Sequence, residues 1–168
     1  MRKFWIALTL FVICNHLANA QEENFIAIAV YNFTRYIDWP NDGNASDFLI
    51  DVIGHKSVYD KLVEITNGRK VGNRAITVRY FAASGSITPC QILFIGFWQS
   101  KDLAMLTEKL NNSHTLIITE KDGLIDSGSC INFVIRNTAI KFEIKKANIQ
   151  KQGLMVSSEL ENIAYKTY

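Results

Sequence analysis

The histidines and acids of this chain are few, and their spacing pairs none of them for catalysis. His55 follows Gly54 at the end of a predicted strand, where open α/β sheets bind ligands. No acid or cysteine stands beside it in the sequence, so a loop histidine is the simpler interpretation. Glu120 and Asp122 follow another strand and fit a polar turn before Gly123. We therefore expect no enzyme. A hydrolase is the weakest alternative, because no nucleophile can be paired with a base.

The sequence also favours no metal and no cofactor. Two histidines and two cysteines beyond residue 20 could in principle hold zinc: His55, His114, Cys90 and Cys130. They form no C-x-x-C or H-x-x-x-H pair, which is the spacing that zinc sites use. None of the glycine-containing stretches has the form of a phosphate-binding loop.

Cys90 and Cys130 each stand just before a predicted core strand. A disulfide between them is permitted in an oxidising compartment. It requires that the two strands are near neighbours, since cysteines whose Cα atoms are more than about 7 Å apart cannot be bridged. The sequence alone does not decide whether this disulfide forms.

Phe97 and Trp98 follow a predicted strand and could line a ligand crevice. Together with His55, they would stand beyond the carboxyl ends of parallel strands, where small molecules bind in such sheets. Their rings could stack on a ligand, or they could pack the helix that follows. The crevice supports one hypothesis, a module that binds a small molecule and passes a signal to a sensor or transport system.

The apolar runs predict an α/β fold. Strands are expected over residues 48–54, 75–81, 92–96 and 114–119, with helices over 57–66 and 101–110. Continuous apolar strands that alternate with helices indicate a mainly parallel sheet of five to six strands with helices on both faces. Residues 131–136 and 140–145 are separated by a short turn, which predicts a C-terminal antiparallel hairpin.

Residues 25–40 predict a helix that opens with seven apolar residues and ends at Pro40, because the residue before a proline leaves the helical region. The first two turns have no polar side, so they must be buried by the domain, by a partner, or by both. Phe25, Ile28 and Ala29 are the candidate partner surface. This helix and the edge hairpin could also join two copies of the chain as a homodimer.

Residues 1–20 have the layout of a secretory signal peptide. Arg2 and Lys3 precede an apolar run, and Ala18-Asn19-Ala20 is a small-residue cleavage site, so cleavage is expected after Ala20. A membrane anchor is the alternative, but the run is shorter than the about 20 residues that a span needs. The remaining residues, 21–168, are expected to form one exported domain.

The charge balance argues against nucleic acid as a partner. The chain has 18 Lys and Arg against 16 Asp and Glu, and removing Arg2 and Lys3 leaves 16 against 16. A net charge near zero disfavours a nucleic-acid binder, which normally has a basic surface.

Four stretches together resemble the YfiR-like family of periplasmic proteins. They are FIAIAVYNFTRYIDWP at 25–40, CQILFIG at 90–96, GSCINFVIRNTAIKFEI at 128–144 and GLMVSSELENIA at 153–164. The resemblance covers nearly all of the chain beyond the leader. Cys90 and Cys130 resemble halves of two different bridges of that family, and the usual partner of neither is present.

The resemblance implies a regulator rather than an enzyme. It implies binding to the periplasmic sensory part of a membrane signalling protein, such as a diguanylate cyclase, which is thereby held inactive. It also implies an outer-membrane partner that can sequester the inhibitor.

Overall fold

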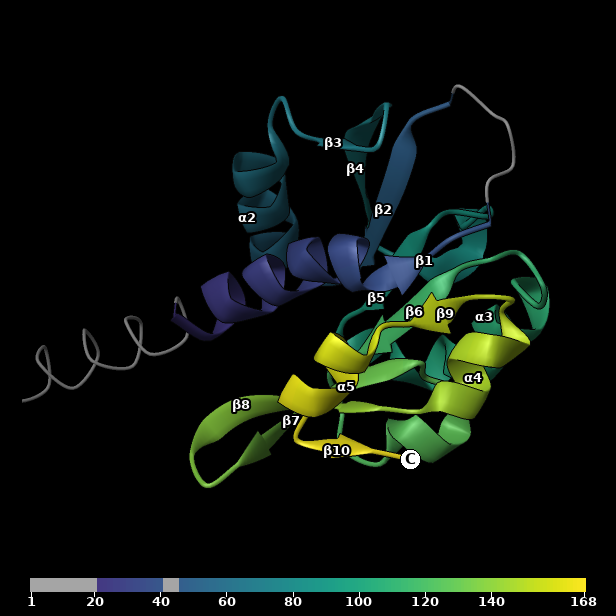
Figure 1. Cartoon of the computed structure of the whole chain (residues 1–168). Coiled ribbons are helices and arrows are strands. Elements are labelled where there is room, and N and C mark those ends of the chain that lie inside the picture. The colour runs from purple at the N-terminus through teal and green to yellow at the C-terminus, as the bar shows by residue number, and fades with distance from the viewer. Residues whose placement is uncertain (1–20, 41–45) are drawn as a thin grey trace, which may run out of the picture.

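The computed structural model describes residues 21–40 and 46–168 (Figure 1). The predicted leader, with its cleavage after Ala20, lies outside the described residues. The main sheet has eight strands in the order β10-β8-β7-β6-β5-β2-β4-β3. In chain order these are β2 (Phe48–Ile53), β3 (Lys70–Val71), β4 (Arg74–Phe81), β5 (Ile92–Ile95), β6 (Leu116–Thr119), β7 (Ile131–Arg136), β8 (Ala139–Ile144) and β10 (Lys166–Thr167).

Strands β4, β2, β5, β6 and β7 are parallel and form the centre of the sheet. Every residue of β5 and β6 is buried. Parallel strands are covered on both faces, and this is why they are continuous apolar runs in the sequence. The predicted fold class is confirmed. The two-residue strands β3 and β10 at the two edges raise the number of strands above the expected five to six.

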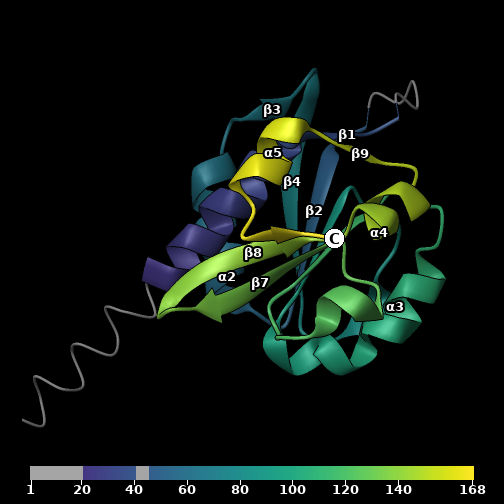
Figure 2. The ribbon, with the colours of Figure 1, turned by 60° about the horizontal axis from the view of Figure 1, so that its bottom comes forward.

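Helices cover both faces of the sheet (Figure 2). The N-terminal helix, described over residues 21–36, and α2 (Lys56–Thr66) lie on one face. The helices α3 (Leu103–Lys109) and α4 (Lys146–Lys151) lie on the other. The strand order explains this arrangement. The crossovers from β2 to β4 and from β5 to β6 run in opposite directions, so right-handed connections place α2 and α3 on opposite faces.

The N-terminal helix packs on the sheet through one stripe of its surface. The buried stripe includes Ile26, Ala27, Val30 and Phe33, at the spacing of one helical face. The ring centroid of Phe33 lies 6.1 Å from that of Phe133 and 5.3 Å from that of Phe142. The helix is therefore fixed to the C-terminal hairpin, which contains both rings.

The helix ends at residue 36 and not at Pro40 as predicted. Ile37–Asp38 form β1, which pairs antiparallel with β9 (Met155–Val156). The backbone of Tyr36 also accepts a hydrogen bond from the N–H of Ser157. Pairing with a distant segment therefore overrides a local helical pattern, which is a weak determinant on its own.

The C-terminal hairpin has the predicted antiparallel form, with β7 and β8 paired over their full lengths. Asn137 and Thr138 form the turn, and both have positive φ angles, 51° and 62°. Two-residue turns with positive φ at both positions match the twist of the strands they connect. The short α5 (Ser158–Ile163) follows β9, and β10 then pairs parallel with β8.

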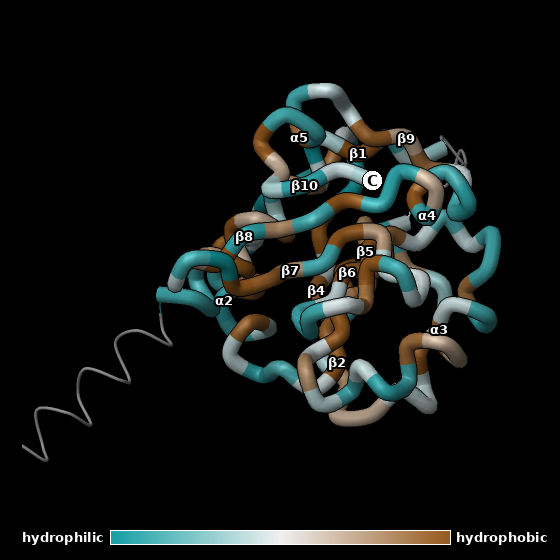
Figure 3. Tube along the Cα trace, turned by 90° about the horizontal axis from the view of Figure 1, so that it is seen from below, coloured by the Kyte–Doolittle hydropathy of each residue, from teal (hydrophilic) through white to brown (hydrophobic). Residues whose placement is uncertain are grey.

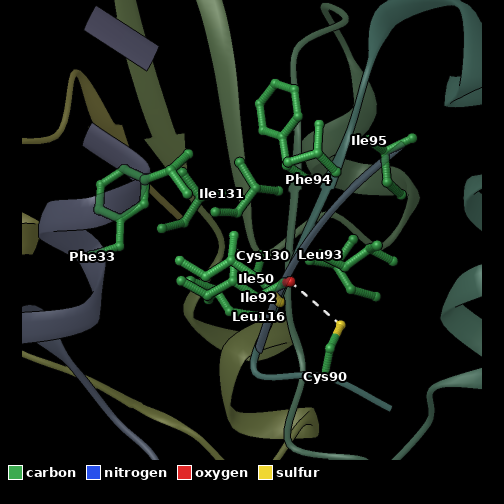
Figure 4. Packing of buried hydrophobic residues seen from close by; sticks show 14 of the residues in the cluster. Phe33, Ile50, Cys90, Ile92, Leu93, Phe94, Ile95, Leu116, Cys130 and Ile131 are labelled. Carbon is green, nitrogen blue, oxygen red and sulfur yellow. Dashed lines mark hydrogen bonds between the residues drawn. The ribbon is translucent and has the colours of Figure 1, made fainter. Parts of the chain in front are cut away.

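The two cysteines lie in the core and are not bridged (Figure 4). Both are free and buried, and the thiol of Cys90 donates to the carbonyl oxygen of Ile92 at 3.3 Å. Strand β6 lies between β5 and β7, whose starts the cysteines precede. Two strand spacings amount to about 10 Å, beyond the roughly 7 Å that a disulfide allows. This separation is too large for a disulfide between Cys90 and Cys130.

Candidate functional site

Three loops meet at the carboxyl edge of the parallel sheet, because β6, β5 and β2 are neighbours with the same direction. His55 lies in the loop after β2, Phe97 and Trp98 lie in the loop after β5, and Glu120 follows β6. The three residues expected from the sequence to form a crevice are thus at one edge of the sheet. Glu120 is an addition that sequence reasoning missed.

His55 has an acidic partner that its neighbours in the sequence do not reveal. Its Nδ1 lies 2.9 Å from Oε1 and 3.0 Å from Oε2 of Glu120. The same Oε1 accepts a hydrogen bond of 2.7 Å from the backbone N–H of Phe97. His55 does lie in a loop, as predicted, but it is paired with an acid, and Glu120 is more than the simple turn residue that the sequence indicated. The available signal was that both residues follow parallel strands and so reach the same edge.

Two glycines allow these loops to approach one another. A Cβ at Gly54 would lie 1.9 Å from Oε1 of Gln99, and its φ of +69° is in the left-handed region. A Cβ at Gly96 would lie 2.9 Å from the carbonyl oxygen of Ile53. The loops after β2 and β5 are therefore packed closely: backbone atoms leave no room for a side chain at Gly96, and the positive φ disfavours one at Gly54.

A second carboxylate reaches the other side of the imidazole. Oε1 of Glu23, in the N-terminal helix, lies 3.8 Å from Nε2 of His55. Burial, the largest influence, lowers the pKa of His55. The hydrogen bond and charge of Glu120, with the smaller effect of Glu23, outweigh burial, so the pKa is raised above its ordinary value of 6.5. The imidazole therefore connects the helix and the sheet edge electrostatically.

The side chains of Phe97 and Trp98 are exposed to solvent. Their side chains are 46% and 78% exposed, and their rings contact each other edge to face with centroids 5.2 Å apart. The ammonium group of Lys121 lies over the ring of Phe97 at 5.6 Å. Rings that are exposed to this extent offer a surface to a partner, but they do not enclose a metabolite.

The pocket beside Glu120 lies on the other side of that residue, between the N-terminal helix and the hairpin. It is lined by Glu22, Ile26, Glu120, Phe133, Val134, Ile135 and Ile140, and its volume is about 140 Å³. Small-molecule sites usually measure about 300–1,000 Å³. This pocket is therefore too small to favour a metabolite site.

The outer stripe of the N-terminal helix is exposed, so the domain alone does not bury the first two turns, which the sequence predicts to be covered by the domain, by a partner, or by both. Phe25 and Ile28 are 43% and 42% exposed, and Ala29 is only partly covered. The ring of Phe25 packs edge-on against Phe133 of β7 at 6.5 Å.

 Phe25, Ile28 and Ala29 thus form one apolar stripe along the solvent side of the helix.

The hairpin continues this apolar stripe. Ile135 is 63% exposed and lies two residues beyond Phe133 on β7, so both side chains project from the same face of the strand. Figure 3 shows β7 as a largely hydrophobic stretch that becomes hydrophilic at the tip of the hairpin. We refer to Phe25, Ile28, Ala29 and Ile135 together as the docking surface. Exposed apolar surfaces of this kind mark interaction sites more often than isolated exposed residues do.

The part of the chain that the structure describes has no group of three or more histidines, cysteines and acids that could hold a metal ion. Within residues 21–40 and 46–168, no helix combines the length and apolar character that a membrane crossing requires.

The fold and this surface define a class of protein: an α/β domain with a paired histidine at the sheet edge and an exposed apolar helix stripe. The family model DUF4154, described as YfiR/HmsC-like, matches residues 24–165, so the chain belongs to the YfiR/HmsC-like family. At the level of the family, this membership supports a periplasmic regulator of diguanylate cyclase signalling rather than an enzyme. No curated protein matches the chain.

Proposed function

We propose that this protein is exported to the periplasm and regulates a membrane signalling protein, such as a diguanylate cyclase, by binding its periplasmic sensory part. Membership of the family supports the signalling role. The single observation that supports binding through a specific face is the exposed apolar stripe of Phe25 and Ile28 on a helix that is otherwise firmly packed.

The proposed mechanism is a shift between two states of the partner. A regulator holds a cyclase inactive only if it binds the inactive state more tightly than the active one. A few side chains that become fully covered on binding supply most of the affinity of such an interface. An outer-membrane partner that covers the same surface would then release the cyclase by competition.

The small-molecule alternative has less support from the geometry. The pocket beside Glu120 is small, and the side chains of Phe97 and Trp98 are exposed to solvent.

Within the proposal, residues 1–20 are removed as a leader and residues 21–168 act as one domain. The docking surface could also pair two copies of the chain, in which case a homodimer would have to separate before it binds the partner.

Replacing Ile28 with aspartate tests the docking surface. Because Ile28 is 42% exposed, we expect the variant to fold with a stability within about 1 kcal/mol of the wild type, as is usual for surface substitutions. A carboxylate at the centre of an apolar interface should nevertheless abolish binding. The measurement is cellular cyclic-di-GMP in a deletion strain of the native host, complemented with each variant and checked for equal protein levels.

Val63→Asp is the matched control, since Val63 of α2 is equally exposed but lies outside the docking surface. Deletion should raise cyclic-di-GMP, and the wild type and the Val63 variant should restore the low level, whereas the Ile28 variant should not. The proposal fails if deletion leaves cyclic-di-GMP unchanged. If the Ile28 variant complements fully, the regulator does not act through this surface.

A further inference from the structure

The imidazole of His55 lies between two carboxylates from different parts of the fold. Glu120, at the end of β6, faces Nδ1, and Glu23, in the first described turns of the N-terminal helix, faces Nε2. A carboxylate accepts hydrogen bonds and donates none when it is ionised. The position of Glu120 therefore keeps a proton on Nδ1 whether the ring is neutral or charged.

The contact with Glu23 depends on the second proton. In the neutral ring, Nε2 carries a lone pair and cannot donate to Glu23. In the charged ring, Nε2 carries a proton, and the distance of 3.8 Å to Oε1 of Glu23 is that of an ion pair. Nδ1 is thus hydrogen-bonded to Glu120 in both protonation states, and only the contact between Nε2 and Glu23 changes with protonation.

Other charged groups around this site are engaged elsewhere. On α2, Lys56 pairs with Asp60 and Lys61 pairs with Glu64, although Lys61 is close enough to Glu23 to feel its charge. After β6, Lys121 lies over the ring of Phe97. On the helix, Glu22 lines the pocket that also contains Glu120. Of the acids on the helix, Glu23 is the one that forms the ion pair with His55.

We propose that His55 is a proton-operated latch: the protonated ring holds the start of the N-terminal helix to the sheet edge through Glu23, and loss of the proton releases it. Phe25 lies two residues beyond Glu23 and belongs to the docking surface. The latch therefore regulates the order of that surface, and this consequence rests on the proposed function.

The direction of the pH effect follows from the raised pKa of His55. A group whose pKa is higher in the folded state stabilises that state fully below its unfolded value, here 6.5, and the contribution is lost as the pH rises through the folded value. The helix start should therefore be held firmly in mildly acidic solution and more loosely in alkaline solution.

Hydrogen exchange and NMR titration of the purified protein test the latch. We expect the amides of residues 24–28 to be about two- to fivefold less protected at pH 8.5 than at pH 5.5, after correction for intrinsic rates, which is the range that a partly exposed ion pair can supply. In Glu23→Gln this difference should vanish, and the His55 pKa measured by NMR should fall. In Glu120→Gln the pKa should fall further, since Glu120 raises it more than Glu23 does.

Glu22→Gln is the matched control, because it removes a carboxylate from the same turn but not the one that pairs with His55. It should keep the pH dependence of exchange. The latch is refuted if protection of residues 24–28 is independent of pH in the wild type, or if Glu23→Gln retains the wild-type pH dependence. A His55 pKa that does not change in Glu23→Gln also refutes it.

None of these measurements involves a partner protein. A failed latch therefore leaves the docking proposal untouched, and a deletion without effect on cyclic-di-GMP leaves the latch untouched.

Discussion

Replacing Phe33 with alanine is expected to lower the free energy of unfolding by about 3–5 kcal/mol, the usual cost of removing a buried aromatic ring. Phe33 is only 2% exposed and contacts both Phe133 and Phe142 of the hairpin. The cavity would open between the N-terminal helix and β7–β8, where the helix has its main apolar support. Urea denaturation followed by circular dichroism measures the change.

Phe25→Ala is the control for this prediction, since it removes the same ring from the same helix. Phe25 is 43% exposed and touches Phe133 only at its edge. Its loss should cost less than half as much. Equal costs for the two variants, or a loss below about 1 kcal/mol for Phe33→Ala, would show that the helix is not held by this contact.

The Phe33 variant should also loosen the helix without dissolving it. Arg69 donates a hydrogen bond of 3.1 Å to the hydroxyl of Tyr31, and this contact joins the helix to the turn after α2 independently of the hairpin. The hydrogen bond from Arg69, which is the largest influence, lowers the pKa of the Tyr31 hydroxyl. We therefore expect the Phe33 variant to keep most of its helical signal at low urea.

Replacing Arg79 with alanine is expected to cost about 2–4 kcal/mol, because it leaves a buried carboxylate without its cation. Asp51 of β2 is fully buried and lies opposite Arg79 of β4, with two hydrogen bonds of 2.7 and 2.8 Å between them. We place the cost at the lower end of the range for buried pairs because a third of the Arg79 side chain is exposed and water can partly replace it.

A double variant separates the pair from the cost of breaking it. Asp51→Leu combined with Arg79→Met removes both charges, and buried pairs replaced by apolar side chains are often tolerated. The double variant should therefore be more stable than Arg79→Ala in urea denaturation. Lys61→Ala, which breaks the exposed pair with Glu64, should leave stability unchanged within error. A double variant that is less stable than Arg79→Ala would mean that packing at Asp51, and not its charge, sets the cost.

The two ends of the N-terminal helix are held by different contacts. Phe33 and the rest of the buried stripe, which includes Ile26 and Ala27 near the helix start, anchor the helix, while the ion pair of Glu23 with the protonated His55 adds a contact before them. A local contact of this strength can open without unfolding the domain. Regulation would therefore act on the first turns of the helix, and the Phe33 end would stay in place.

The sequence by itself determined the layers of this protein. Strands β5 and β6 are continuous apolar runs because parallel strands are covered on both faces, and this pattern is visible without a structure. The short turn at Asn137 and Thr138 required an antiparallel hairpin, because so few residues cannot connect parallel strands. Local patterns of this kind depend only on residues close together in the chain.

Only the tertiary structure decided which distant groups meet. His55 and Glu120 are 65 residues apart, and the parallel register of three strands brings them within 2.9 Å. Pairing of β1 with β9, in a separate two-stranded sheet, ends the helix, and the strand order of the main sheet keeps Cys90 and Cys130 on opposite sides of β6. The packing of the helix on the sheet also decides that Ile28 is partly exposed to water, because the buried side of the helix start carries Ile26, Ala27 and Val30.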